Sequence, residues 1–394
     1  MSFDPVIIAS VARTPMAGFQ GAFAPMTAVE LGSAAIRSAV ERAGIGSEAV
    51  ERIYMGCVLP AAQGQAPARQ AALGAGLARS VEATTVNKMC GSGMQATIMA
   101  CEAILSGSID IAVAGGMESM TNAPYALPKH RGGARIGHDR VVDTMMMDGL
   151  EDAYARGKPM GAFAEDSARE YQFSREEQDA YALASLSRAN AAIAGGVFAA
   201  EIVPVEVSTR GSATTVAVDE QPGKARPDKI PLLKPAFVDG GTVTAANSSS
   251  ISDGAAALVL VRESVAQSRD FPIEARIMGM AAHAQEPALF TTAPVPAIRK
   301  LLAKTGWTIE DVDLFEINEA FAVVAMIAMR DLGIPHEKLN VNGGATALGH
   351  PIGASGARII VTLVSALKAR GLKRGVAALC IGGGEATAVA VEIA

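Results

Sequence analysis

The sequence predicts an α/β fold made of two related domains with a further segment inserted between them. Strand-like runs such as Ile111–Ala114 are continuously apolar, as expected for strands covered on both faces. A degenerate internal repeat links the two ends of the chain, and the composition shifts between them. We therefore expect an N-terminal half over residues 1–119, completed by about 246–270, a loop domain over 120–245 and a C-terminal half over 271–394.

The two halves contain the same elements in the same order. Residues 34–54 have a helix, a glycine stop and a strand, and residues 296–315 repeat this pattern. Farther on, small residues open a helix that leads to an apolar strand and more glycines, first over 91–116 and again over 354–384. Because order and type agree across four elements, the repeat indicates a duplication.

The segment between the halves has a different composition. It carries the run Met145-Met146-Met147, a charged stretch over 174–179 and a proline-rich stretch over 221–235. Ser174 followed by Glu177 predicts a capping box for a helix that ends near Gly195-Gly196. Since loops held by a rigid scaffold often carry binding residues, we expect this loop domain to contribute substrate contacts.

Composition excludes several classes of protein. A formal net charge of -6 with 19% charged residues gives no electrostatic footprint for nucleic acid. Residues 1–10 hold only a short apolar run, which predicts a first strand and not an export signal. No apolar run reaches the roughly 18 residues that span a bilayer, so we expect no membrane segment. The cysteines form no small disulfide framework and favour a reducing cytoplasm: Cys57, Cys90, Cys101 and Cys380.

Cys90 is the first candidate for chemistry. It lies where the β-branched run Thr84-Thr85-Val86 has ended and where small residues open a probable helix. Backbone N–H groups and the helix dipole at such a turn favour the thiolate, so we expect a lowered pKa and an activated nucleophile. A buried structural thiol is the alternative.

Three more stretches fall where the second half should have its loops. Asn318 follows an apolar strand, and open α/β sheets bind ligands at the carboxyl ends of their strands. His350 lies among glycines that let a ligand approach closely, and Cys380 ends a strand before Gly382-Gly383-Gly384. A structural histidine and a buried thiol remain alternatives for the last two.

The combination of these groups narrows the chemistry. Zinc sites typically contain a pair of ligands two to four residues apart, and these residues offer none, so we expect no metal. Hydrolysis would not require two thiols. A cysteine nucleophile, a histidine base and a second cysteine suit acyl transfer coupled to carbon–carbon bond chemistry.

Five ordered motifs span the chain: Asn87–Gly93, Gly115–Met120, Asn318–Phe321, Gly349–Gly353 and Cys380–Gly384. Through them the sequence resembles the thiolases over essentially the whole chain. The resemblance implies a thiolase fold: two similar mixed-sheet α/β domains stacked as αβαβα, with a loop domain over the active site. It also implies coenzyme A thioesters as substrates, no cofactor, and a homo-oligomer, dimer or tetramer, with tetramer contacts near 125–145.

The resemblance also implies a role for each candidate. Cys90 would be the acylated nucleophile, and His350 the base that activates it. Cys380 would be the acid/base that removes the α-proton of an acetyl-CoA or protonates the departing enolate. Asn318, through a bound water, and His350 would hold the enolate oxygen, while the backbone N–H groups of Cys90 and Gly382 would hold the tetrahedral intermediate.

Within the family the chain is similar to the acetyl-CoA C-acetyltransferase group, which interconverts acetyl-CoA and acetoacetyl-CoA. Met117–Tyr125 and Asn340–Gly344 carry this closer similarity. By the same resemblance, the substrate-binding residues are Met160, Arg226, Phe237, Ala245, Ser249, Phe290, Ala320 and Phe321. An arginine stacked on adenine and an apolar tunnel for pantetheine are physically reasonable contacts.

Three departures from the family pattern leave the acyl group open: Pro159, Glu385-Ala386 and the loop over 282–286, which contains His283. The alternative is a thiolase for longer or substituted 3-oxoacyl-CoA, such as 3-oxoadipyl-CoA. A thiolase-like protein that binds acyl-CoA without turnover is another alternative.

A more remote alternative comes from another class of enzyme. Gly91–Ala96 fits the G-x-G-x-x-A fingerprint, and Asp110 lies near the spacing of a ribose-binding acid, as in an NAD-dependent dehydrogenase. That interpretation leaves Cys90, His350 and Cys380 without roles. The fingerprint would also open the first βαβ unit, whereas this motif comes later in the chain.

Overall fold

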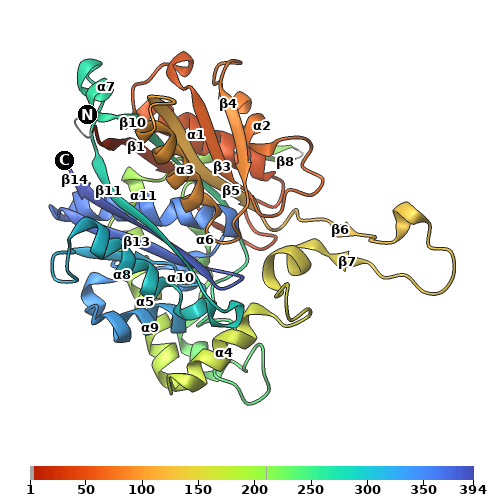
Figure 1. Ribbon diagram of the computed structural model, residues 1–394. Helices are drawn as coiled ribbons and strands as arrows, with labels where there is room; N and C mark the ends of the chain where they lie inside the picture. Colours follow the sequence, from red (N-terminus) through yellow and green to blue (C-terminus); the bar gives the residue numbers. More distant parts are fainter. Residues whose placement is uncertain (1–3, 210) are drawn as a thin grey trace.

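A continuous mixed sheet forms the centre of the molecule (Figure 1). The computed structural model describes residues 4–209 and 211–394, so the first three residues of the predicted N-terminal half and of its first strand lie outside the described part. The strand order is β12-β13-β14-β11-β1-β10-β5-β3-β4, with β2 paired to β10. Their bounds are β1 Val6–Arg13, β2 Ala17–Gly18, β3 Arg52–Gly56, β4 Glu82–Val86, β5 Ile111–Ser119, β10 Ser252–Arg262, β11 Ala275–Ala284, β12 Leu314–Ile317, β13 Arg374–Ile381 and β14 Glu385–Ile393.

The two halves of the sheet have the same topology. In the first, β1, β10 and β5 pair antiparallel, and β5, β3 and β4 pair parallel. In the second, β11, β14 and β13 pair antiparallel and β12 joins parallel, while Phe315 bridges Leu339 in the place of a fifth strand. The halves join where β1 pairs antiparallel with β11, a short contact that the sequence repeat did not predict.

Helices cover both faces of the sheet and separate its halves. Helices α1 and α2 pack on the outer face of the first half, and α8 and α9 on the outer face of the second. Helices α3 and α11 lie between the halves and contact strands of both, which gives the predicted αβαβα layers. These helices are α1 Ala28–Arg42, α2 Pro67–Gly74, α3 Ser92–Leu105, α7 Glu263–Ser268, α8 Pro294–Thr305, α9 Ala322–Leu332, α10 Ala345–Leu348 and α11 Ile352–Arg370.

Strands β1, β5, β10, β13 and β14 are buried on both faces over most of their length, as their apolar sequences predicted, whereas β11 is only partly buried. Along β1, Ile7 packs with the outer helices and Ile8 with the central pair, since successive side chains point to opposite faces. Two glycines let the central helices approach closely. A Cβ at Gly93 would lie 2.8 Å from the backbone nitrogen of Ala357, and one at Gly356 would collide with Met94. These glycines occupy corresponding positions in the sequence repeat.

Helix α11 corrects one expectation. It has 19 residues with a mean hydropathy of 1.4, enough by length and composition to cross a membrane. We expected no apolar stretch of this length, and this helix shows that the expectation was wrong. In this structure 89% of that stretch is buried inside the protein, where it forms the central layer.

The described part of the segment between β5 and β10 adds no strand to the large sheet, and its strands β6 to β9 form two small two-stranded sheets. The predicted capping box is confirmed: the backbone N–H of Glu177 donates to Ser174 Oγ at 3.1 Å, and that of Ser174 donates to Glu177 Oε2 at 2.7 Å. The helix ends at Ala194, with Gly195 as its cap, close to the predicted point. The segment contains β6 Tyr125–Ala126, β7 Val142–Asp143, α4 Met160–Glu170, α5 Arg175–Ala194, β8 Val205–Thr209, β9 Ser212–Val216 and α6 Glu220–Lys224.

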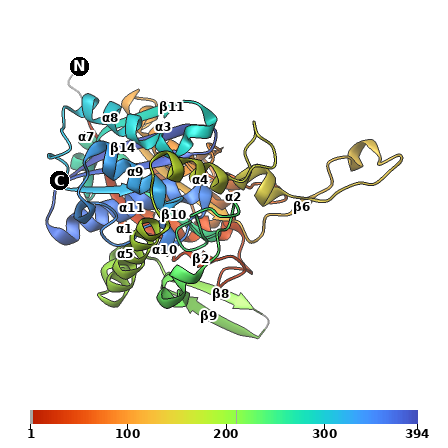
Figure 2. The same cartoon turned by 90° about the horizontal axis from the view of Figure 1, so that it is seen from below.

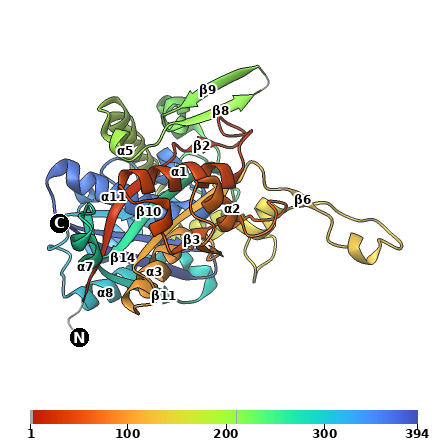
Figure 3. The same ribbon diagram turned by 90° about the horizontal axis from the view of Figure 1, so that it is seen from above.

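Two parts of this segment project from the body of the molecule. The arm, residues 125–143, extends far from the sheet on β6 and β7 (Figures 1 and 2). The hairpin of β8 and β9 projects in another direction (Figure 3). Short turns complete the chain: η1 Ser47–Ala49, η2 His130–Gly132, η3 Met146–Leu150, η4 Val197–Ala200, η5 Pro227–Leu232, η6 Pro287–Thr292 and η7 His336–Lys338.

Candidate active site

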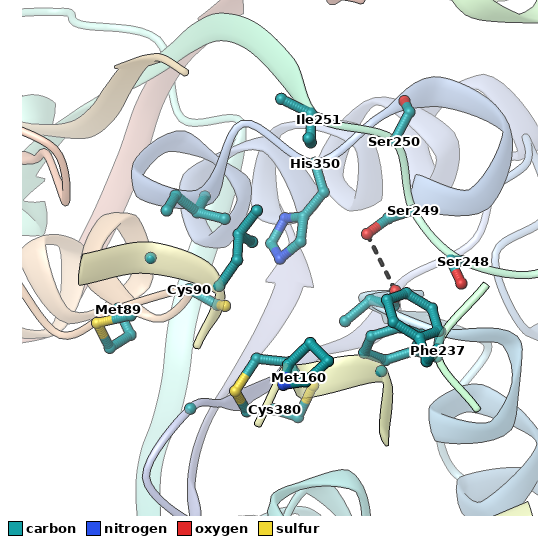
Figure 4. A pocket seen from close by; sticks show the side chains of 18 of the residues that line it. Met89, Cys90, Met160, Phe237, Ser248, Ser249, Ser250, Ile251, His350 and Cys380 are labelled. Carbon is teal, nitrogen blue, oxygen red and sulfur yellow. Dashed lines mark hydrogen bonds between the residues drawn. The ribbon is translucent and has the colours of Figure 1, made fainter. Parts of the chain in front are cut away.

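A cavity of about 410 Å³ lies where loops of both halves meet the inserted segment. Cys90 precedes α3, His350 precedes α11 and Cys380 is near the end of β13, so each lies at a strand or helix end, as predicted. Their side chains face one space (Figure 4). The lining includes Cys90, His350, Cys380 and Gly382 together with Met160, Phe237, Ala245, Ser249, Phe290, Ala320 and Phe321.

Cys90 is held at a tight turn between β4 and α3. Met89 adopts a positive φ of 47°, which turns the chain so that the thiol faces the cavity. Burial raises the pKa of the Cys90 thiol to about 11, although the backbone N–H groups of Gly382 and of Cys90 itself oppose the rise. The expectation of a lowered pKa was therefore wrong, because desolvation outweighs the N–H groups.

His350 is buried and hydrogen bonded through both ring nitrogens. Nδ1 lies 2.6 Å from Ser355 Oγ, and Nε2 lies 3.4 Å from Asn318 Nδ2. Burial, with a smaller contribution from the Arg358 cation, lowers the pKa of His350 to about 3. The ring is consequently neutral near pH 7, and one of its nitrogens carries a lone pair that can accept a proton.

Cys380 is almost fully buried at the end of β13. Burial raises the pKa of its thiol well above the usual value, and a negative charge on Cys90 would raise it further. The chain then turns through Gly383 and Gly384, with φ of 95° and 85°, a conformation suited to glycine. This turn directs the backbone N–H of Gly382 toward Cys90.

Asn318 lies behind His350 and does not itself line the cavity. Its Nδ2 faces Nε2 of His350, while its buried Oδ1 has no hydrogen-bond partner among the described residues. A buried amide oxygen of this kind can accept a hydrogen bond from a water or a ligand.

Glu319, the next residue, anchors the inserted segment beside the site. Its carboxylate accepts hydrogen bonds from Tyr181 and Ser185 of α5, both at 2.9 Å, and from Asn340 at 2.8 Å. Thr346 donates through its hydroxyl at 2.6 Å. Because all these partners converge on one buried carboxylate, α5 is held against the loops of the C-terminal half.

Aromatic rings form the wall on which the predicted coenzyme A contacts lie. Phe321 packs edge-on against Phe237 and Phe290, with centroids 5.9 and 6.4 Å apart. Ser249 donates both its N–H and its hydroxyl to the carbonyl of Ala320, each at 3.0 Å. Arg226 is exposed and does not line the cavity, so its contact with the nucleotide stays a prediction.

Sequence reasoning missed the apolar wall around the Cys90 sulfur. Some of its residues lie in the five sequence motifs or in the run 145–147, but sequence spacing does not show that these side chains meet, because they come from distant segments. Its π-helical turn η3 is of a type frequent at functional sites. The wall contains Met89, Met120, Met146, Leu150, Ile251 and Ile352.

The three departures from the family pattern have different positions. Pro159 lines the cavity. Glu385 forms an ion pair with Lys88, two residues before Cys90, and so links the two cysteine loops. His283 Nε2 lies 3.0 Å from Gln285 Oε1, and its Nδ1 lies 2.9 Å from Lys300 Nζ. His283 does not line the cavity.

The glycine motif of the dehydrogenase alternative has a structural role here. Gly93 faces α11 at the helix contact described above, and Asp110 is paired with Arg262 at 2.6 Å. Among residues 4–209 and 211–394, no group of three or more His, Cys, Asp or Glu side chains is placed to hold a metal ion.

Comparison with known proteins gives a consistent result. The family model "Thiolase, N-terminal domain" matches residues 6–264, and "Thiolase, C-terminal domain" matches residues 271–393. Acetyl-CoA acetyltransferase 2 of Arabidopsis thaliana is 52% identical over 98% of this chain and 97% of its own length. An acetyl-CoA acetyltransferase of Rhizobium meliloti is 48% identical over the whole of both chains.

Solved structures give the same result as the family models and the sequence relatives. The acetyl-CoA acetyltransferase of Bacillus anthracis has a TM-score of 0.97 and 40% identity, over 100% of this chain and 99% of its own. A thiolase of Ascaris suum, solved in complex with coenzyme A, has a TM-score of 0.93 and 42% identity, over 99% and 100%. The family and the fold follow from matches of this extent: the chain belongs to the thiolase family.

Proposed function

We propose that this protein is an acetyl-CoA C-acetyltransferase. It condenses two acetyl-CoA molecules to acetoacetyl-CoA and coenzyme A, and it catalyses the reverse cleavage. The observation that carries this proposal is the meeting of two thiols, a neutral histidine and the Gly382 N–H around one cavity. Relatives named acetyl-CoA acetyltransferase, 48 to 52% identical to this chain, support it.

The first half-reaction loads Cys90. Neutral His350 takes the thiol proton, and the sulfur attacks the carbonyl carbon of acetyl-CoA. The N–H groups of Cys90 and Gly382 hold the negative oxygen of the tetrahedral intermediate. The bond to the coenzyme A sulfur then breaks, and this leaving thiolate takes its proton from Cys380. The products are acetyl-Cys90, free coenzyme A, a Cys380 thiolate and protonated His350.

The second half-reaction forms the carbon–carbon bond. The Cys380 thiolate removes an α-proton from a second acetyl-CoA, and protonated His350, with Asn318 acting through a bound water, would hold the enolate oxygen. The enolate carbon attacks acetyl-Cys90, and the Cys90 sulfur leaves with the proton from His350. All three side chains return to their starting forms, so this scheme needs no metal or redox cofactor.

The acyl group is small and uncharged in this proposal. The described lining includes serine hydroxyls and one histidine but neither lysine nor arginine. A terminal carboxylate, as in 3-oxoadipyl-CoA, would lie unpaired among apolar side chains, which is costly. The cavity therefore favours an acetyl group over a dicarboxylic chain.

A panel of 3-oxoacyl-CoA substrates tests this proposal. We expect the highest kcat/KM for coenzyme A-dependent cleavage of acetoacetyl-CoA, with lower values for longer chains and the lowest for 3-oxoadipyl-CoA. A preference for a longer or dicarboxylic chain would refute the short-chain assignment. Binding of acyl-CoA with no cleavage of any substrate would favour a protein that binds without turnover.

Both reacting cysteines must stay reduced. Cys90 and Cys380 are free thiols in the structure, as this chemistry requires. A reducing compartment protects them, so the cytoplasm remains the location that we propose.

We also propose that the protein is a homo-oligomer, a tetramer assembled through the arm. Apolar side chains along the arm are solvent-exposed in the single chain: Tyr125, Leu127, Ile136 and Val141, with Ile136 at 97%. Large exposed apolar groups of this kind mark interaction surfaces.

Charge on the arm should weaken this assembly. We expect the double variant Ile136→Asp and Val141→Asp to have a lower mass by light scattering than the wild-type protein, because aspartate would be buried in the contact. His138→Ser, an exposed polar change on the same arm, is the control. An unchanged mass of the double variant would place the contact elsewhere.

A further inference from the structure

His350 has a hydrogen-bond partner that the family motifs did not single out. Its Nδ1 lies 2.6 Å from Oγ of Ser355, five residues farther on in the first turns of α11. Oγ of Ser355 also lies 2.9 Å from the carbonyl oxygen of Pro351. Ser355 is fully buried and His350 is 5% exposed, so solvent does not compete for these contacts.

The direction of the hydrogen bonds follows from the chemistry of the groups. The carbonyl oxygen of Pro351 can only accept, and the Ser355 hydroxyl lies within hydrogen-bond distance of it, beside the backbone N–H groups of Ala354 and Ser355. When the hydroxyl donates its single hydrogen there, Oγ accepts from the ring and Nδ1 carries the hydrogen of the neutral imidazole. This pattern, a helical serine bonded to the carbonyl four residues earlier, is a common one.

The opposite nitrogen is consequently a base. Nε2 carries a lone pair on the side of the ring that faces Asn318, where the amide Nδ2 lies 3.4 Å away and can donate. With the Asn318 amide in this orientation, the other tautomer would place Nε2–H against the Asn318 N–H, and its Nε2 would have no lone pair for the proton of Cys90. The surroundings of the ring therefore favour a single tautomer.

We infer that Ser355 is a positioning residue. It holds His350 in the tautomer whose Nε2 is unprotonated and can take the proton of Cys90. This inference rests on the proposed function, since it assigns a role within that reaction. Ser355 is not among the residues that line the cavity. It acts through His350, as the partners of catalytic and metal-binding histidines do when they fix which nitrogen is protonated.

The tautomer of the wild-type protein tests the inference directly. The chain has five histidines, so ring-¹⁵N labelling gives few signals, and the His350 signals are those lost in His350→Asn. We expect Nδ1 to be protonated and Nε2 unprotonated at neutral pH. A proton on Nε2 in the wild-type protein would overturn the inference. This result is independent of turnover, so it separates the inference from the proposed function.

Variants of Ser355 test the consequence for catalysis. We expect Ser355→Ala to lower kcat by about 10- to 100-fold with little change in KM, the loss typical when the partner of a metal-binding histidine is removed. Alkylation of Cys90 by iodoacetamide should slow as well, and its pH profile should move to higher pH. Ser355→Thr keeps the hydroxyl and should recover most of the rate.

Ser365→Ala, which removes a buried hydroxyl from the same helix, is the matched control. It should leave kcat, the alkylation profile and the tautomer unchanged. If Ser355→Ala retains the wild-type tautomer and kcat, Ser355 has only a packing role and the inference fails.

Discussion

Replacing Cys90 with serine is expected to lower the rate of acetoacetyl-CoA cleavage by at least about 10⁴-fold, the order of loss seen when a catalytic nucleophile is removed. A hydroxyl is far less acidic than a thiol. His350, whose pKa is lowered to about 3, is already a weak base for a thiol whose pKa is raised to about 11. It cannot ionise a serine in the same place. Steady-state cleavage and intact-mass detection of the acetylated enzyme are the two measurements.

Cys101→Ser is the matched control for this variant. Cys101 is buried in α3, the helix that Cys90 precedes, and it does not line the cavity. The control should keep the wild-type rate and take up one acetyl group from acetyl-CoA, whereas Cys90→Ser should take up none. Acetylation of Cys90→Ser at another site, with cleavage retained, would disprove the acyl-Cys90 intermediate.

The two pKa shifts also describe the resting enzyme. Burial raises the pKa of Cys90 and lowers that of His350, so both groups are neutral at pH 7 and no thiolate–imidazolium pair is stored. In the proposed reaction the thiolate forms when substrate is present, and the N–H groups of Cys90 and Gly382 would hold the charge that develops on the carbonyl oxygen. A neutral pair would protect the proposed nucleophile, whose side chain is half-buried, from unwanted alkylation and oxidation between turnovers.

Much of the fold was predictable because it is encoded locally and then repeated. The glycine stops and apolar strands predicted two related α/β halves, the resemblance to thiolases predicted their layers, and Ser174 with Glu177 predicted the start of α5. The pairing of β1 with β11 was not predictable, because only two residue pairs join the halves there and neither strand has a local signal for its partner.

The site was predictable where a motif carried it. Cys90, His350 and Cys380 meet as expected, since each follows or ends an element of the duplicated fold. The direction of the Cys90 pKa shift was not predictable from the sequence, because the side chains that desolvate the thiol come from distant segments. Ser355 was missed for a related reason: its role depends on the turn that brings Oγ to the imidazole, and sequence spacing alone does not give that geometry.

Replacing Cys380 with serine should separate the two half-reactions. We expect condensation and cleavage to fall by about 10²- to 10⁴-fold, the usual contribution of a general acid–base group. Acetylation of Cys90 by acetyl-CoA should persist, because protonated His350 can supply the proton that the leaving coenzyme A requires. Intact mass after mixing with acetyl-CoA measures the first step, and deuterium uptake into the methyl group of acetyl-CoA measures the second.

Comparing the two cysteine variants identifies the residue that removes the α-proton of acetyl-CoA. Cys380→Ser should form acetyl-Cys90 but exchange no α-hydrogen, since a serine hydroxyl is too weak an acid to become the required base. Cys90→Ser should not be acetylated, and Cys101→Ser should retain both activities. If Cys380→Ser still exchanges deuterium at the wild-type rate, the base is another group, and His350, which faces the same cavity, is the remaining candidate. If it loses acetylation as completely as Cys90→Ser, the coenzyme A thiolate depends on Cys380 for its proton, and His350 cannot replace it.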